Sequence, residues 1–279
     1  MPNDFELVPT GATINHDRFF KAYSMLGGNC QHNHRDALFV DLDETVVSVL
    51  DVMRQNYGRD FAGSIGGLRY SEEPGLTEEE KARISHEFSR GGFYKNLPLI
   101  DSDILPILHS LSRSHNIGYL SARFNTTDIY ELTKRNIRNH KLPMAPIMLN
   151  PYVGAKGPKF KIDTITRFKK EFGAPGFVPI LIDDEPSQAA AIIAHNSQHP
   201  DDMVYQICMV GSELRSIQFA KSHRDKISGT AAGVYGHTLH QEANGVYFSK
   251  TSDLIATIDR VRRDSQTRAP HHHAHRSDR

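Results

Sequence analysis

Short apolar runs recur along the chain, and most of them end at a polar or acidic residue. Within each run the apolar side chains are continuous and do not alternate with polar ones, which is typical of strands that a sheet buries on both faces. We therefore expect a parallel sheet in the interior of the protein. The runs that predict its strands are residues 37–40, 117–120, 145–149, 178–182 and 203–210.

Between these runs, apolar positions recur every three or four residues, which is the spacing of an amphipathic helix. This alternation of strands and helices predicts a doubly wound α/β domain. The expected helices cover residues 103–111, 126–139, 162–173, a segment that begins at Pro186, and 251–263.

Residues 46–97 depart from the alternation. They combine a glycine-rich middle with a charged, helix-like run, so we interpret them as a small, mostly helical insertion. The insertion lies within a core of residues 37–263, which follows an N-terminal extension of residues 1–36. Residues 224–246 are rich in glycine and histidine and are expected to form a long surface loop. The histidine-rich tail, residues 264–279, is expected to be disordered.

Composition narrows the class of protein. The 279 residues include 33 basic and 33 acidic side chains, so the formal net charge is zero, and 38% of the residues are apolar. This is the balance of a soluble globular protein, and no apolar run approaches the ~20 residues that span a membrane. Cys30 and Cys208 lie far apart, so we expect a reducing, cytoplasmic compartment. Zero net charge does not indicate nucleic acid as a partner, although a local basic patch stays open.

The first apolar run leads directly into the acidic segment Asp41-Leu42-Asp43-Glu44-Thr45. Ligands of open α/β sheets bind beyond the carboxyl ends of the strands, so Asp41 and Asp43 should lie at the binding crevice. Two such carboxylates can share a divalent cation or divide the roles of nucleophile and acid. The alternative is a structural turn in which both aspartates cap backbone N–H groups.

Polar residues with complementary chemistry follow the later runs. Ser121 ends the second run, where a hydroxyl suits a phosphate oxygen, and Asp183 and Asp184 end the fourth. Lysines precede the helix at Ile162, where a fixed cation would offset the charge of a transferring phosphoryl group. Each feature also has an ordinary interpretation as a helix cap, a solvated charge or an acidic helix N-terminus. Their joint occurrence at the strand ends of one sheet favours a functional site.

Together these residues resemble the four motifs of the haloacid dehalogenase (HAD) superfamily. The DxDxT motif corresponds to residues 41–45, the strand-end serine to Ser121, the lysine to Lys161 and the acidic pair to residues 183–184. The resemblance extends over about residues 37–210. It implies a Rossmann-like three-layer α/β fold with a parallel sheet, in which the insertion serves as a small helical cap after the first strand.

The same resemblance implies a Mg²⁺-dependent phosphomonoester hydrolase that works through an aspartyl-phosphate. By that analogy Asp41 is the nucleophile, and Asp43 protonates the leaving oxygen and then activates water. Ser121 and Lys161 would hold the phosphoryl oxygens.

The Mg²⁺ of this scheme would be bound by Asp41, the backbone carbonyl of Asp43 and Asp183, with Asp184 in support. These ligands suit the ion, because Mg²⁺ is a hard cation that prefers carboxylates, carbonyls and water. Bound there, it would neutralise charge on a phosphoryl group.

Two details of the site stay open at this stage. Lys159 and Lys156 are alternatives to Lys161 as the phosphate-binding lysine. A weaker resemblance to deoxyribonucleotidase-type members makes Arg123, together with Ala122, a candidate contact for the substrate, although an ordinary surface arginine would look the same.

The substrate is not defined by these residues. A small cap could admit a nucleotide, a sugar phosphate or a larger phosphorylated end of a nucleic acid or protein. Tyr57, Phe61 and Tyr70 of the insertion could stack on a base, although aromatic residues there more often form the core of a cap. The alternatives to a hydrolase are a phosphotransferase and a non-catalytic binding protein of the same fold. The presence of Asp43 favours catalysis.

Overall fold

The computed structural model of the chain describes residues 36–59, 75–151, 157–172, 177–209 and 244–268. Within these ranges, six strands form one parallel sheet in the order β3-β2-β1-β4-β5-β6. The strands are β1 (Ala37–Val40), β2 (Asn116–Phe124), β3 (Ile147–Asn150), β4 (Ile180–Asp183), β5 (Tyr205–Met209) and β6 (Val246–Ser249). Almost every strand residue is buried, as continuous apolar runs predict.

The five predicted strands are confirmed, and the sheet contains a sixth, β6, that the sequence pattern does not predict. Its run of three apolar residues is short, and it begins at Val246, the last residue of the expected 224–246 loop. Gly245, with φ at +93°, precedes the strand at the point where the chain enters the sheet beside β5. Residues 224–243 of the expected loop lie outside the described residues.

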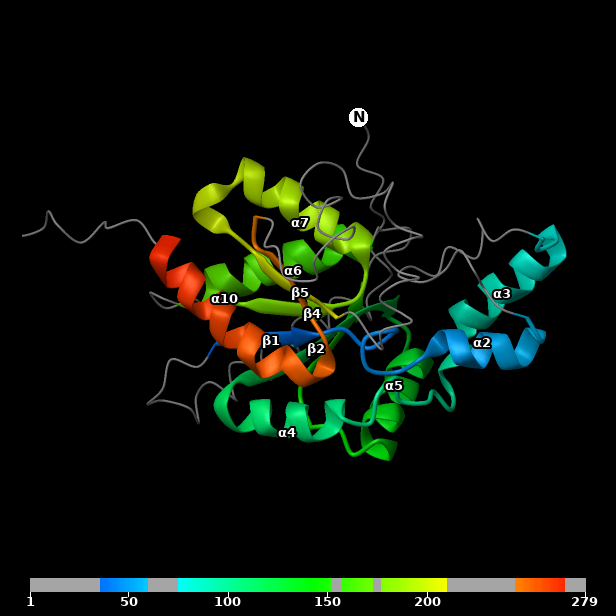
Figure 1. Cartoon of the computed structure of the whole chain (residues 1–279). Helices are drawn as coiled ribbons and strands as arrows, with labels where there is room; N and C mark the ends of the chain where they lie inside the picture. The colour runs from blue at the N-terminus through cyan, green and yellow to red at the C-terminus, as the bar shows by residue number, and fades with distance from the viewer. Residues whose placement is uncertain (1–35, 60–74, 152–156, 173–176, 210–243, 269–279) are drawn as a thin grey trace, which may run out of the picture.

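Helices cover both faces of the sheet (Figure 1). Alternate residues of β1 face the two helical layers. Leu38 and Val40 pack among side chains of α4 (Ile104–Ser114), α5 (Thr127–Asn139) and α10 (Leu254–Arg268). Ala37 and Phe39 pack on the other face, against α6 (Gly157–Phe172) and α7 (Pro186–Gln198). The result is a three-layer α/β, Rossmann-like arrangement.

The helix boundaries correct two expectations. α6 begins at Gly157, five residues before Ile162, so Lys159 and Lys161 lie inside its first turns and do not precede it. Pro158 is compatible with this early start, because a proline in the first turn removes no helical hydrogen bond. α10 continues to Arg268, which corrects the expectation that residues 264–279 are disordered throughout; residues 269–279 lie outside the described ranges.

The stretch between β1 and β2 contains the helices of the predicted insertion. They are α2 (Val49–Tyr57), α3 (Glu78–Arg90) and the 3-10 turn η2 (Gly92–Tyr94), and α2 and α3 project away from the sheet in Figure 1. Thr77 and Glu80 form a reciprocal capping box that starts α3. Residues 60–74 lie outside the described ranges.

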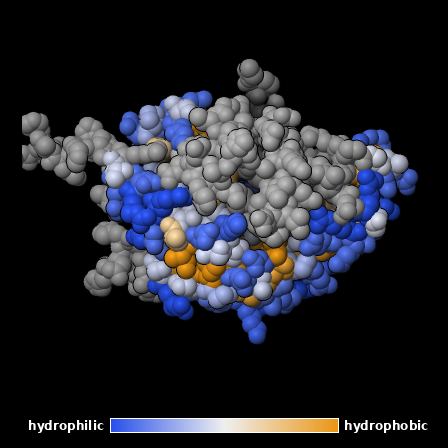
Figure 2. Space-filling view, viewed as in Figure 1, coloured by the Kyte–Doolittle hydropathy of each residue, from blue (hydrophilic) through white to orange (hydrophobic). Residues whose placement is uncertain are grey.

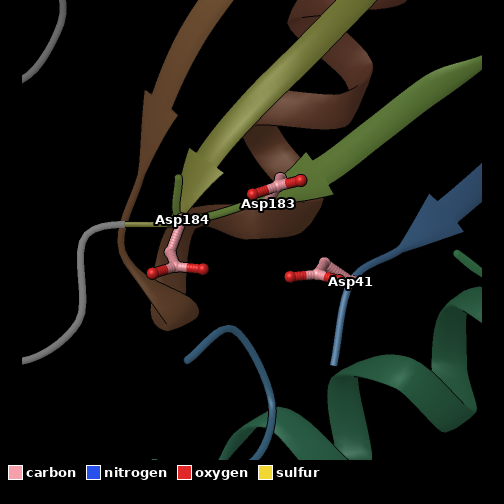
Figure 3. A group of neighbouring side chains, drawn as sticks. All are labelled: Asp41, Asp183 and Asp184. Carbon is pink, nitrogen blue, oxygen red and sulfur yellow. The ribbon is translucent and has the colours of Figure 1, made fainter. Parts of the chain in front are cut away.

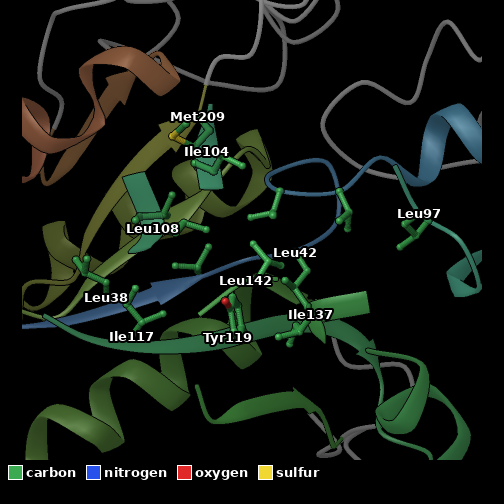
Figure 4. Close-up of a cluster of buried hydrophobic side chains, with 14 of the residues drawn as sticks. Leu38, Leu42, Leu97, Ile104, Leu108, Ile117, Tyr119, Ile137, Leu142 and Met209 are labelled. Atoms are coloured by element: carbon green, nitrogen blue, oxygen red, sulfur yellow. The ribbon is translucent and has the colours of Figure 1, made fainter. Parts of the chain in front are cut away.

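The insertion shares one apolar cluster with the sheet. Met53, Phe88 and Leu97 belong to the same group of buried side chains as Leu38 and Tyr119, of which Figure 4 labels Leu38, Leu97 and Tyr119. Because these contacts are continuous, the insertion is anchored to the layer that carries α4 and α5.

The surface of the described residues is mainly hydrophilic on the side shown in Figure 2, with an apolar area in the region of α4 and the start of α10. Ile255, near the start of α10, is 42% exposed. Across the ranges that the structure describes, no helix combines the length and apolarity that crossing a bilayer requires.

The position of β1 defines where a ligand would bind. β1 lies between β2 and β4. The chain adds β2 and then β3 on one side of β1, and it adds β4 on the other side. Binding crevices of doubly wound sheets form at this reversal, beyond the carboxyl ends of the strands. The residue after β1 is Asp41, whose N–H donates to Ile182 O of β4 at 2.9 Å.

Two helix-ending glycines provide a test of the packing around the insertion. Gly58 and Gly91 both have positive φ, but a Cβ on Gly58 would meet no atom within 4 Å, whereas one on Gly91 would lie 2.8 Å from Leu132 Cδ1. We expect Gly58→Ala to cost about 1 kcal/mol of unfolding free energy, and Gly91→Ala about 1–3 kcal/mol more. Denaturant unfolding measures both, and equal losses would contradict the close packing at Gly91.

Candidate active site

Three buried carboxylates meet at the carboxyl ends of β1 and β4. Asp41 follows β1, Asp183 is the last residue of β4 and Asp184 follows it, and their side chains face a common space (Figure 3). One oxygen from each lies within 4.8 Å of the others, and each residue is at most 9% exposed. The sequence predicts acidic residues separately at the ends of the first and fourth strands. These residues lie together because the two strands are neighbours in the sheet.

Lys161 is the cation that contacts this cluster among the described residues. Its Nζ lies 2.7 Å from Asp183 Oδ2 and 3.0 Å from Asp41 Oδ1, and its side chain is 4% exposed. Phe160, the preceding residue of α6, is buried against the sheet, and this packing places the amine of Lys161 next to the carboxylates. The alternative Lys159 pairs with Asp163 on the exposed side of α6, and Lys156 lies outside the described residues.

Thr45 links the two acidic segments. Its hydroxyl donates to Asp184 Oδ1 at 2.9 Å, and the N–H of Asp184 donates to the same hydroxyl at 3.1 Å. The N–H of Glu185 donates to Asp183 Oδ1 at 2.8 Å. These contacts fix the orientation of two carboxylates before any ligand binds. Thr45 is the last residue of the DxDxT motif, which is its signal in the sequence.

Asp43 is engaged by a different cation. Arg123 Nε donates to Asp43 Oδ2 at 2.9 Å, and Nη2 donates to Oδ1 at 2.6 Å, so the guanidinium binds both carboxylate oxygens. Asp43 is 17% exposed on its side chain, whereas the side chain of Arg123 is fully buried. The Asp43 carboxylate lies outside the cluster of three carboxylates, so its predicted part in metal binding depends on its backbone carbonyl alone.

A pocket of about 310 Å³ opens over these groups. Ala122 and Arg123, the candidate substrate contacts, line it together with Asp41, Asp43, Lys161 and Asp184. Ser121 does not line the pocket; it is fully buried, and its Oγ accepts a long hydrogen bond of 3.4 Å from Arg123 N.

Aromatic residues line the pocket beside the polar groups, and they are not the ones suggested from the sequence. Phe88 of α3, Tyr94 of η2 and Phe124 at the end of β2 contribute to the wall. Of the residues suggested for stacking, Tyr57 packs inside the insertion with its ring 6.4 Å from that of Phe93. Phe61 and Tyr70 lie outside the described residues.

Burial and mutual repulsion disfavour the ionised carboxylates. Burial, with the charges of Asp183 and Asp43, raises the pKa of Asp41 from 3.8 to about 7 despite the attraction of Lys161. Burial and the charge of Asp183 raise the pKa of Asp184 well above its ordinary value. Burial alone would lower the pKa of Lys161, but the charges of Asp183 and Asp41 outweigh it and raise that pKa. Lys161 is therefore charged. Its single positive charge cannot balance the three carboxylates when all of them are ionised.

This donor set suits a metal ion. Three carboxylates offer hard oxygen ligands, and Asp41 Oδ1 is buried without a well-aligned hydrogen bond although Lys161 is near. Hard divalent cations such as Mg²⁺ and Ca²⁺ prefer oxygen ligands of this kind. The residues Asp41, Asp183 and Asp184 could therefore hold a metal ion.

Comparison with known proteins does not assign the site. No protein-family model matches the chain, and no curated protein matches it significantly. The function proposed below therefore rests on the residues of the site and their geometry.

The raised pKa of Asp41 predicts a pH dependence of stability. Because its folded pKa of about 7 exceeds the unfolded value of 3.8, the folded protein binds more protons than the unfolded chain between about pH 4 and 7. The unfolding free energy of the metal-free protein should therefore fall as pH rises through this window. Asp41→Asn should reduce that fall. Denaturant unfolding at several pH values checks this, and an unchanged slope in the variant would contradict the assigned shift.

A divalent cation should stabilise the protein through the three carboxylates. At 100 times its dissociation constant, Mg²⁺ would add about 2.7 kcal/mol to the unfolding free energy and raise the melting temperature. Asp184→Asn should weaken this effect, because it removes a charged ligand while its amide oxygen can still accept from Thr45. Asp163→Asn, which changes an exposed aspartate on α6, should leave it intact. Equal Mg²⁺ stabilisation in both variants would exclude Asp184 as a ligand.

Proposed function

We propose that the protein is a Mg²⁺-dependent phosphomonoester hydrolase that acts through an aspartyl-phosphate on Asp41. The observation that carries the proposal is the buried contact of Lys161 with Asp41 and Asp183, next to Asp184. The resemblance of the four sequence motifs to the HAD superfamily supports the same chemistry.

The charges of the site favour a phosphoryl group. When all three carboxylates ionise, they carry two more negative charges than the one ammonium balances, and a divalent cation would compensate for that excess. When bound, Mg²⁺ would supply the positive charge that lets an anionic phosphate approach a carboxylate. Asp41, Asp183 and Asp184 would hold the ion, and Lys161 keeps its own charge close to Asp41, where the phosphoryl group would arrive.

The lining of the pocket favours Asp41 over Asp183 and Asp184 as the proposed nucleophile. Asp183 is fully buried and absent from the pocket wall, and Asp184 is held by Thr45. Asp41 lines the pocket beside Lys161, and Asp43 lines it two residues further along the chain. The two aspartates have different partners, Lys161 for one and Arg123 for the other, so their carboxylates lie in different electrostatic surroundings.

The reaction proceeds in two displacements. A carboxylate oxygen of Asp41 attacks phosphorus, the bond to the leaving oxygen breaks, and Asp43 gives a proton to that oxygen. Asp43 then takes a proton from water as the water oxygen attacks phosphorus. The bond between phosphorus and Asp41 breaks, inorganic phosphate leaves, and both aspartates return to their starting forms.

An aryl phosphate separates the two displacements, because its good leaving group needs little help from an acid. With Mg²⁺, the wild-type protein should release the phenol continuously. Asp43→Asn should release one equivalent in a burst and then stall, because the phosphorylated Asp41 is not hydrolysed. Asp41→Asn should release none.

Stopped-flow absorbance of the phenol and mass spectrometry of the stalled protein measure these outcomes. The expected phosphoryl group lies on the peptide that contains Asp41. Asp163→Asn is the matched control and should retain full turnover. Turnover by Asp41→Asn at the wild-type rate would contradict the proposed nucleophile.

A further inference from the structure

The guanidinium of Arg123 lies where the insertion, α5 and the DxDxT segment meet. Nε and Nη2 donate to Asp43, and Nη1 donates to Thr133 Oγ1 of α5 at 2.8 Å. The ring of Tyr94, in η2, lies with its centroid 4.3 Å from the guanidinium carbon. All three nitrogens are therefore engaged within the protein, and the side chain is fully enclosed.

Thr133 determines the plane of that guanidinium. Because an arginine can only donate, the hydroxyl of Thr133 must accept from it and directs its own proton to Ile129 O at 2.7 Å. Thr133 is fully buried and does not line the pocket. A continuous hydrogen-bonded path therefore runs from the backbone of α5 through Thr133 and Arg123 to Asp43.

Tyr94 is fixed from the same helix. Its backbone oxygen accepts from Asn136 Nδ2 of α5 at 2.8 Å, and both residues are buried. α5 thus holds the ring on one face of the guanidinium and the hydroxyl at its edge. A guanidinium held in this way can bind a carboxylate through its two other nitrogens, Nε and Nη2, in one orientation only.

We propose that Arg123 is a positioning residue, oriented by Thr133, that places the Asp43 carboxylate for the attack of water on the phosphorylated Asp41. This inference rests on the proposed function. It assigns Arg123 no contact with the substrate, in contrast to the role suggested from the sequence. Its consequence is that loss of the Thr133 contact slows the second displacement and spares the first with an aryl phosphate.

The test compares Thr133→Val with Thr133→Ser. Valine keeps the shape of the side chain but removes the acceptor for Arg123 Nη1, whereas serine restores it. Because small misplacements of a reacting group can cost up to about 10²-fold, we expect Thr133→Val to lower kcat about tenfold. KM should fall with it and kcat/KM should stay unchanged, because binding and the first displacement are spared. The burst of phenol should keep its wild-type rate, and Thr133→Ser should regain most of the turnover.

A matched control comes from α10. Thr257 is also buried and also donates to the carbonyl four residues earlier, Asp253 O, at 3.0 Å, but it lies outside the pocket wall. Thr257→Val should leave kcat and the burst unchanged. An equal loss of turnover in Thr257→Val and Thr133→Val would mean that the loss comes from general destabilisation. That result would overturn the proposal.

Arg123→Lys separates positioning from substrate binding. A lysine keeps the charge but cannot donate two parallel hydrogen bonds to Asp43, so kcat should fall further than in Thr133→Val, with the burst retained. A raised KM at unchanged kcat, or a slowed burst, would mean that Arg123 holds the substrate and would overturn the proposal.

Crystal structures of the wild type and of Thr133→Val keep this test independent of turnover. If the wild type hydrolyses no phosphomonoester, the proposed function fails, and the position of the Asp43 carboxylate decides the structural claim by itself. A displaced carboxylate in Thr133→Val, with the wild-type position in Thr257→Val, supports positioning by Arg123. An unmoved carboxylate overturns it.

Discussion

The buried ammonium of Lys161, shared by Asp41 and Asp183, is the interaction on which the candidate site depends. Without it, the carboxyl ends of β1 and β4 would present buried carboxylates to one another with no counter-charge, an arrangement that burial strongly disfavours. The fold supplies the cation by packing α6 on the sheet, and the parallel pairing of β1 with β4 sets the spacing of the two aspartates. Burial, together with the charges of Asp183 and Asp43, nevertheless outweighs the attraction of Lys161 and raises the pKa of Asp41 to about 7.

A second buried cation organises the other half of the site. Arg123 holds Asp43, so two aspartates that are two residues apart lie in different electrostatic surroundings. In the proposed reaction, Asp41 is the nucleophile and Asp43 exchanges protons. The same arginine contacts Tyr94, so the helical insertion, which shares an apolar cluster with the sheet, is tied to the chemistry of the pocket.

The sequence predicts what depends on local patterns and fails where distant packing decides. Continuous apolar runs locate five strands, and the acidic strand ends locate the site. β6 has too short a run to be recognised, and it forms because β5 offers it a neighbour. Thr133 and Tyr94 carry no local signal, since their importance comes from contact with Arg123. Ser121 fits a motif by position, but the fold encloses it behind the pocket wall.

The central claim, two successive displacements through Asp41, is tested most directly by the stereochemical course at phosphorus. A phosphorothioate monoester made chiral with oxygen isotopes is hydrolysed by the protein with Mg²⁺ in isotopically labelled water, and the configuration of the released thiophosphate is determined. Each in-line displacement inverts the configuration, so two displacements through Asp41 give net retention. Net inversion would show a single direct attack by water and would contradict it.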